Sequence, residues 1–290
     1  MFNSVMKRYV VSCAKHIAAV PSQSRCLSTS PATCKSNQPA GDAENNANEG
    51  WLKKLLVRRI EPTKEQHSRM LSDKEVIYEL QTHNVRPDSI DGYLKNYEQA
   101  VQLCQKIPNL QYELIGSWSV HVGDLDQYVH LWKHQGGYAA IDKTNDILLN
   151  NQEYTKLCNQ RGPFLRSRHL QYMLAFSFWP NIEFKSGSNI YEIRSYSLKP
   201  GTMIEWGNNW ARAINHRRSN DEPFAGFFSQ VGRLYNVHHF WCYKNLEVRT
   251  QTRQAAWMSP GWDECVAYTV PLIKEMQSKI LHPTSFSPTQ

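Results

Sequence analysis

Carboxylates are missing from the start of this 290-residue chain, where Asp42 is the first acidic residue. Five basic residues come before it, so they carry most of the formal net charge of +7. The rest of the chain keeps 28 of the 33 Lys and Arg residues against all 26 Asp and Glu residues, and is nearly neutral. A nucleic-acid-binding protein would keep its basic excess on the folded domain. The charge pattern therefore predicts no nucleic-acid partner.

Long hydrophobic runs are also missing. No segment approaches the roughly 18 apolar residues that cross a membrane as a helix, and the best run, "YMLAFSFW" at 172–179, has the length of a strand. No G-x-x-x-x-G-K-[ST], no Rossmann glycine pattern at a strand-to-helix junction and no G-x-S-x-G occurs. The chain therefore has no sequence support as a nucleotide-binding enzyme or a serine hydrolase.

The seven cysteines form no Cys-x-x-Cys pair, which argues against a zinc site or a disulfide framework. Three of them lie before residue 36. We expect the other four to be buried or half-buried thiols, at Cys104, Cys158, Cys242 and Cys265. No metal site and no cofactor is predicted.

The first 35 residues combine basic, small and hydroxyl side chains with apolar residues at three- and four-residue spacing. That pattern predicts a basic amphipathic helix, the physical signature of a mitochondrial transit peptide. "RCLSTS" at 25–30 resembles a matrix-protease cleavage region. The alternatives are a secretory signal and a plain disordered tail. Lys15 and His16 interrupt the only apolar stretch that could serve as a secretory signal. We therefore expect residues 1–35 to be a transit peptide and the protein to be mitochondrial, in the matrix or displayed at the outer surface.

Residues 36–75 have two predicted parts. The segment 36–50 is polar and rich in helix breakers, so it is predicted to be a disordered linker. The following "WLKKLLVRRI" at 51–60 places Trp51 and its apolar neighbours on one helical face and the bases largely on the other. Such a short amphipathic helix either docks on its own protein, which is the commoner case, or makes peripheral contact with a membrane.

An internal repeat organises the rest of the chain. Residues 77–101 match residues 190–214 without a gap, and a second match follows further on. The paired ring positions are Tyr93 with Trp206, Tyr97 with Trp210, His130 with His239, and Trp132 with Trp241. A period of about 110 residues is too long for a solenoid repeat and has the size of a domain. We therefore predict two copies of one domain, at 76–180 and 188–290.

Each copy has the same predicted order of elements: strand, helix, two strands, helix and strand. Apolar periodicity and turn residues set their bounds. The first copy has them at 77–83, 88–107, 112–122, 126–134, after Gly136-Gly137 and at 168–178; the second has them at 190–196, 201–218, 224–231, 234–244, near Glu247 and within 269–281. The order βαββαβ is the ferredoxin-like motif of the α+β class.

The predicted strands carry apolar residues on both faces. In 168–178, Tyr172 and Leu174 lie on one face, whereas Met173 and Ala175 lie on the other. A sheet with helices on one side must cover its other side, and the sheet of the other copy is the simplest cover. We therefore predict two ferredoxin-like modules that form a dimeric α/β-barrel arrangement within one chain.

A stripe of large apolar residues follows helical spacing at Met203, Trp206, Trp210 and Ile214. Large rings stand at the equivalent positions of both copies, which favours a helix face packed on a sheet over a ligand site. The polar segment "INHRRSNDEPF" at 214–224 is expected to be an exposed loop. The bases in and before that segment form a local basic spot, which either compensates the C-terminal end of the helix dipole or binds an acidic ligand; they are Arg212, Arg217 and Arg218.

A pocket between sheet and helix has four candidate residues, His130, Asn209, Trp210 and His239. Barrels of this kind include haem-degrading and cofactor-free monooxygenases. In those enzymes Asn, Trp and His side chains shape the cavity. The alternative, which we favour, is that the histidines are partly buried and have backbone hydrogen-bond partners. His238 and His239 are neighbours on a strand, so they point to opposite faces and cannot chelate one metal ion. No catalytic residue is predicted.

Long motifs are distributed over both copies. They are "VHLWKHQGGY" (129–138), "GTMIEWGNNWARAI" (201–214), "AGFFSQVG" (225–232), "VHHFW" (237–241) and "AAWMSPGWDECVAYTVPL" (255–272), with "WLKKLLVRRIEPTKEQHSRMLSDKE" (51–75) before the first copy. Together they resemble the NipSnap family from about Trp51 to the C-terminus. One departure is Ala225, where a Gly is usual.

The resemblance implies two dimeric α/β-barrel-type domains in a mitochondrial protein. It also implies a link to vesicular transport, or to the marking of damaged mitochondria by recruitment of autophagy receptors and adaptors. No catalytic activity is established for that family, so we expect a non-enzymatic adaptor with protein partners, alone or as a homo- or hetero-oligomer. A linear binding element would lie in 36–75, since a short motif must be exposed. The alternative is a small-molecule or haem-binding oxidoreductase that uses the pocket near His239 and Trp210.

Overall fold

The computed structural model describes residues 69–72, 75–218 and 222–290. The transit peptide predicted for 1–35 lies outside the described residues. So do the linker and amphipathic helix predicted within 36–75, of which only the last few positions are described. Within the part of the chain that is described, no helix is both long and apolar enough to cross a membrane.

The chain divides into two units, Met1–Arg59 and Ile60–Gln290, and the second contains every described residue. Both predicted copies of the repeat lie in it. The first copy consists of β1 (Ile77–Val85), the 3-10 turn η2 (Pro87–Ser89), α3 (Ile90–Lys106), β2 (Tyr112–Val122), β3 (Gln127–His134), α4 (Gly137–Asn150), α5 (Gln152–Arg161), the 3-10 turn η3 (Gly162–Phe164) and β4 (Leu165–Ala175).

The second copy repeats this order. It consists of β5 (Ile190–Leu198), α6 (Met203–Ala213), the 3-10 turn η4 (Ile214–His216), β6 (Pro223–Val231), β7 (Asn236–Tyr243), α7 (Leu246–Trp257), α8 (Trp262–Thr269), the 3-10 turn η6 (Val270–Leu272) and β8 (Ile273–Pro283). The short helix and strand predicted within 269–281 are therefore η6 and β8. The helix predicted at 201–218 is shorter, because α6 ends at Ala213 and continues only as a 3-10 turn.

The second helix of each copy is broken in two, which the sequence pattern does not predict. After α4, Asn151 has an extended backbone, and its side-chain oxygen accepts a hydrogen bond from the Tyr154 N–H at 2.9 Å. That contact caps the N-terminus of α5. In the second copy Gly261 precedes α8 with a φ of +88°. The break allows α5 to pack against α3 and α8 to pack against α6.

The eight strands close into one barrel in the order β1-β3-β2-β8-β5-β7-β6-β4, and β4 returns to β1. Each copy contributes four antiparallel strands in a ferredoxin-like order. The two sheets join at β2–β8 and β4–β6, so the last strand of each copy pairs with the second strand of the other. The predicted α+β barrel of two repeats is confirmed.

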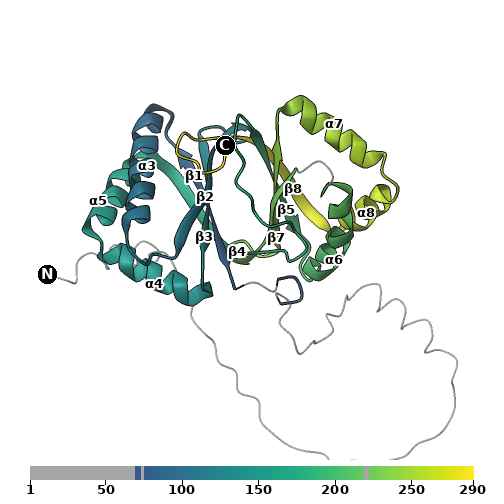
Figure 1. The fold of residues 1–290 in the computed structure, drawn as a ribbon, viewed down its shortest axis with the longest axis horizontal. Helices are drawn as coiled ribbons and strands as arrows, with labels where there is room; N and C mark the ends of the chain where they lie inside the picture. Colours follow the sequence, from purple (N-terminus) through teal and green to yellow (C-terminus); the bar gives the residue numbers. More distant parts are fainter. Residues whose placement is uncertain (1–68, 73–74, 219–221) are drawn as a thin grey trace, which may run out of the picture. The chain divides into compact units, whose positions relative to one another are not determined.

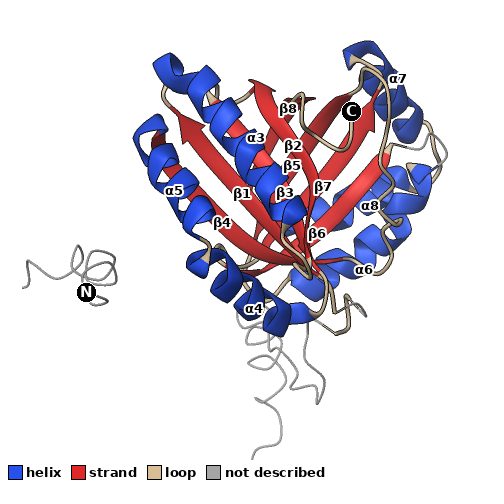
Figure 2. Ribbon diagram, turned by 60° about the vertical axis from the view of Figure 1, so that its left-hand side comes forward, coloured by secondary structure: helices blue, strands red, loops and turns tan. Residues whose placement is uncertain are grey.

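Helices cover the barrel only from outside. α3, α4 and α5 lie over the sheet of the first copy, and α6, α7 and α8 lie over that of the second (Figures 1 and 2). Each strand sends alternate side chains into the barrel and toward the helices. In β7, Phe240 packs in the barrel interior with Trp118, whereas Trp241 packs in the helix layer with Trp210. The apolar residues on one face of each strand therefore pack in the barrel interior, and those on the other face pack against the helices.

Trp206 and Trp210 belong to the helix layer of the second copy, where they are 1% and 7% exposed. Tyr93 and Tyr97 take the same places in the first copy. The prediction that this stripe is core is therefore confirmed. The four thiols are buried or half-buried, also as predicted, at Cys104, Cys158, Cys242 and Cys265.

The segment after α6 is not the exposed loop that its composition predicts for 214–224. Ile214 is fully buried, and Arg217 and Glu222 are 3% and 2% exposed. The two charges form an ion pair, which offsets much of the cost of removing each from water. The prediction of a basic spot in an exposed loop is therefore wrong for Arg217.

Candidate functional site

His239 on β7 lies in the middle of the helix layer of the second copy. Its side chain is fully buried, and neither ring nitrogen has a hydrogen-bond partner among the described residues. Indole rings are its close neighbours, with centroids at 4.4 Å for Trp179 and 4.6 Å for Trp210. Burial, followed by the charge of Arg194, lowers the pKa of His239 well below its usual value. The ring is therefore neutral at physiological pH.

Tryptophan fills the space around this histidine. Five indole N–H groups of the layer have no partner among the described residues, those of Trp179, Trp206, Trp210, Trp241 and Trp262. The packing depends on Gly226 in β6, since a Cβ there would lie 2.3 Å from the Trp179 ring. Neither His239 nor Trp210 lines either of the two cavities described below. The aromatic cluster therefore forms the packed core between the sheet and the helices of the second copy.

His130, the counterpart of His239, lies in the helix layer of the first copy. It forms hydrogen bonds with the Tyr93 hydroxyl at 2.7 Å and with the Ser117 hydroxyl at 2.9 Å. Its ring stacks on Tyr97 with a centroid distance of 3.8 Å. Both ring nitrogens thus have partners, but these are side-chain hydroxyls and not the backbone groups that were predicted.

The four predicted pocket residues are therefore divided between two layers. His239 and Trp210 touch each other in the second copy. Asn209 is buried on α6, where its Oδ1 accepts a hydrogen bond from Arg212 at 2.7 Å. His130 lies in the first copy, so no single pocket includes all four. Among the described residues, no group of three His, Cys, Asp or Glu side chains could hold a metal ion.

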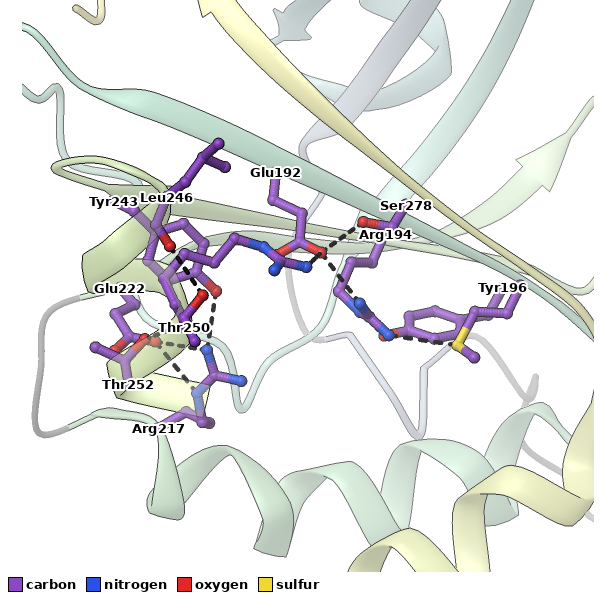
Figure 3. Close-up of polar contacts among 12 residues, drawn as sticks. Glu192, Arg194, Tyr196, Arg217, Glu222, Tyr243, Leu246, Thr250, Thr252 and Ser278 are labelled. Atoms are coloured by element: carbon purple, nitrogen blue, oxygen red, sulfur yellow. Dashed lines mark hydrogen bonds and ion pairs between the residues drawn. The ribbon is translucent and has the colours of Figure 1, made fainter. Parts of the chain in front are cut away.

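A buried carboxylate is the polar centre of the second copy (Figure 3). Glu192 on β5 is completely buried and accepts two hydrogen bonds from Arg249, both at 2.8 Å. Arg194 and the Ser278 hydroxyl also donate to it, at 3.0 and 2.6 Å. Burial alone would raise its pKa, but the hydrogen bond from Arg249 and the charge of Arg194 outweigh burial and lower the pKa to about 2.

A second buried ion pair holds the segment between α6 and β6 (Figure 3). Arg217 donates to Glu222 through Nε at 3.2 Å and through Nη2 at 2.5 Å, and Nη2 also donates to the Tyr243 hydroxyl at 2.9 Å. The guanidinium lies 4.3 Å from the ring centroid of Trp241. Because its charge is already neutralised, Arg217 is a structural residue and does not offer a binding site for an acidic ligand.

The first copy leaves space under its helices. A cavity of about 360 Å³ lies between its sheet and the helices α4 and α5, and we name it the repeat-one cavity. Glu79 on β1 lies in its wall and pairs with His134 Nε2 at 2.9 Å. The other carboxylate oxygen accepts from Gln81 at 2.5 Å and from the Tyr112 hydroxyl at 3.2 Å. Arg161, at the end of α5, lines the same cavity.

The sequence did not predict this cavity, because the matched segments of the two copies, 77–101 with 190–214 and 129–133 with 238–242, do not include Arg161. The available signal was a difference between them. Arg161 stands two residues before Pro163, and Thr269 stands two residues before Pro271 in the matching turn. A charge in one copy and a small hydroxyl in the other suggest different roles for the two sites.

The barrel interior encloses a second cavity, of about 460 Å³, at its polar end. His238 lines it and hydrogen-bonds with the Ser195 hydroxyl at 2.8 Å. Burial and the charge of Lys279 lower the pKa of His238 to about 4. Lys279 in turn pairs with Asp124 at 2.8 Å. His238 and His239 thus face opposite sides of the sheet, as predicted.

Two ferredoxin-like repeats closed face to face, with helices outside, define this chain as a dimeric α/β-barrel protein. The fold is similar to that of a candidate monooxygenase from Fusobacterium nucleatum subsp. nucleatum. The TM-score is 0.56 at 10% sequence identity, over 73% of this chain and 93% of that one. At such low identity the likeness concerns the fold alone.

Sequence comparison defines the family more narrowly. The NIPSNAP family model matches residues 78–180 and 191–288. Protein NipSnap of Drosophila melanogaster is 62% identical over 267 residues, which cover 92% of this chain and 93% of that protein. Human protein NipSnap homolog 2 is 46% identical over 244 residues, covering 83% and 85%. The chain belongs to the NipSnap family.

Proposed function

We propose that this chain is a non-enzymatic mitochondrial adaptor, which presents a protein-binding surface on a rigid barrel. Its partners are autophagy receptors and adaptors, and its role is the recruitment of these proteins to mitochondria; vesicular transport is the alternative process. The proposal is supported by membership of the NipSnap family. It is carried structurally by one exposed apolar surface.

That surface lies where α7 ends, and we name it the α7 corner. Trp257 and Met258 are 57% and 84% exposed, whereas the preceding Ala256 is buried. The Trp257 ring contacts Trp262 of α8 at a centroid distance of 6.4 Å. A tryptophan held by a neighbouring ring, beside a flexible methionine, has the chemistry of a binding hot spot. All eight strands pair within the chain, so the barrel does not require this corner to cover a sheet.

The experiment measures binding of the purified full chain to a panel of purified autophagy receptors and adaptors. We expect at least one member to bind, and we expect Trp257→Ala with Met258→Ser to weaken that binding about tenfold or more, as hot-spot truncations do. Leu246→Ala is the matched control, because Leu246 is an exposed apolar residue at the other end of the same helix. Deletion of 36–75 tests the linear element separately.

Failure of every panel member to bind would refute recruitment of autophagy proteins. Binding that neither the α7 corner variant nor the 36–75 deletion weakens would place the partner on another surface.

A further inference from the structure

We propose that the repeat-one cavity binds a small organic monocarboxylate, with Arg161 as the anchor of the carboxylate group. The cavity lies under α4 and α5 of the first copy, whereas the α7 corner belongs to the second. The inference therefore does not depend on the adaptor function.

Arg161 is a buried cation for which no described residue supplies a counter-ion. The residue is 7% exposed, and none of the described residues forms an ion pair with it. Its Nε donates to Asn96 Oδ1 at 2.9 Å, but its Nη2 has no hydrogen-bond partner among the described residues. The guanidinium lies 4.7 Å from the ring centroid of Tyr97. An amide oxygen and a ring face ease the burial of a charge without neutralising it, so a carboxylate would supply the counter-charge.

The second copy has no cation at the position of the chain that corresponds to Arg161. At the equivalent place in the second copy, Thr269 satisfies its hydroxyl by donating to the Cys265 carbonyl at 2.8 Å. Seven residues earlier, Tyr154 of the first copy corresponds to Trp262 of the second, which is buried among the tryptophans. One copy therefore fills its helix layer with rings, and the other keeps a cavity beside a charged side chain. This contrast assigns Arg161 to ligand binding and not to folding.

The charges around the cavity favour a monoanion. His83 also lines it, but burial, followed by the charge of Arg161, lowers the pKa of His83 to about 3, so this ring adds no positive charge at neutral pH. Arg168 is exposed at the cavity wall. Glu79 already accepts hydrogen bonds from its own neighbours and disfavours a multiply charged anion. One buried guanidinium matches one carboxylate, whereas phosphate sites commonly combine several donors.

The remaining walls favour a flat or short apolar body. Ring and aliphatic side chains surround the polar groups, and they are Tyr112, Leu148, Tyr154, Leu170 and Tyr172. A volume of about 360 Å³ is at the small end of ligand pockets. Aromatic monocarboxylates combine the required charge, size and shape, and benzoate is the simplest probe of this class.

The test is titration of the full chain with benzoate, benzamide and inorganic phosphate. Binding is measured by calorimetry and by ligand-observed NMR. We expect benzoate to bind. Benzamide, which is the neutral amide of benzoate, and inorganic phosphate should each bind at least tenfold more weakly. Arg161→Met should weaken benzoate binding by about tenfold to a hundredfold, the value of a charge-assisted hydrogen bond. Arg212→Met is the matched control, since Arg212 donates to Asn209 as Arg161 donates to Asn96, and it should leave binding unchanged.

Tyr154→Trp is a second route to the same answer if Arg161→Met does not fold. It copies the residue of the second copy and should block the cavity while leaving Arg161 in place. The proposal is overturned if benzoate does not bind, if phosphate or benzamide binds as tightly, or if binding survives both substitutions.

Discussion

Glu192 offers the most direct test of the energetics of the second copy. Glu192→Gln keeps the size of the side chain and removes its charge. The carboxylate is fully buried and is held by Arg249, Arg194 and Ser278. Glutamine has one acceptor oxygen and an amide group that points two hydrogens at its neighbours, so it cannot satisfy both guanidinium groups. We therefore expect the variant to fold and to be markedly less stable.

The pKa provides the magnitude. In the folded chain the pKa of Glu192 is about 2, against an ordinary value of 4.5. Each unit corresponds to about 1.4 kcal/mol, so the ionised group stabilises the fold by about 3 kcal/mol at neutral pH. Because the folded pKa is depressed, this contribution is present above pH 4.5 and is lost as the pH falls toward 2. The difference between wild type and Glu192→Gln should follow the same course.

The assay is urea unfolding of both proteins at pH 7 and at several values down to pH 2.5. We expect a difference in unfolding free energy of about 3 kcal/mol at pH 7, which shrinks steadily below pH 4.5. Glu79→Gln is the matched control in the first copy, where no guanidinium among the described residues pairs with the carboxylate. A difference below about 1 kcal/mol at pH 7, or one that does not change with pH, would refute the reasoning.

Three further predictions use the same unfolding measurement. Gly226→Ala should destabilise by about 1–3 kcal/mol, because its Cβ would lie 2.3 Å from an indole ring, whereas Gly162→Ala meets nothing within 4 Å and should be nearly neutral. His130→Leu should cost about 1–3 kcal/mol by removing one hydrogen-bond partner from each of two buried hydroxyl groups, whereas His239→Leu should stay within about 1.5 kcal/mol; equal losses would contradict the assignment. Glu222→Ala should cost about 3–5 kcal/mol by stranding a buried guanidinium, and a loss below 1 kcal/mol would show that the pair is not buried in solution.

The repeat and the barrel could be predicted because they depend on periodic apolar residues. Strands with apolar residues on both faces require two covers, and a domain-sized repeat supplies the second cover. The division of the second helix could not be predicted in the same way. In the first copy it depends on a single capping contact of Asn151, and in the second copy it occurs at Gly261, which has a positive φ.

The candidate site was harder to predict, for a physical reason. The polar composition of 214–224 predicts that Arg217 and Glu222 are exposed, because composition contains no information about their pairing with each other. Arg161 gives no sign in the sequence of its burial, which arises from the packing of α5 against α3. Histidines and tryptophans in a sequence suggest a ligand-binding site, yet His239 and the tryptophans around it pack in the core.

Closure of the barrel inside one polypeptide has an evolutionary consequence. When two identical subunits form such a barrel, every mutation is present in both subunits. A change that is favourable in one half must therefore be tolerated in the other. Here the junctions β2–β8 and β4–β6 join halves that are encoded separately. Arg161 and Thr269 can therefore drift apart without a penalty to the opposite half. Tandem fusion turns an obligatory symmetry into two independently adjustable sites.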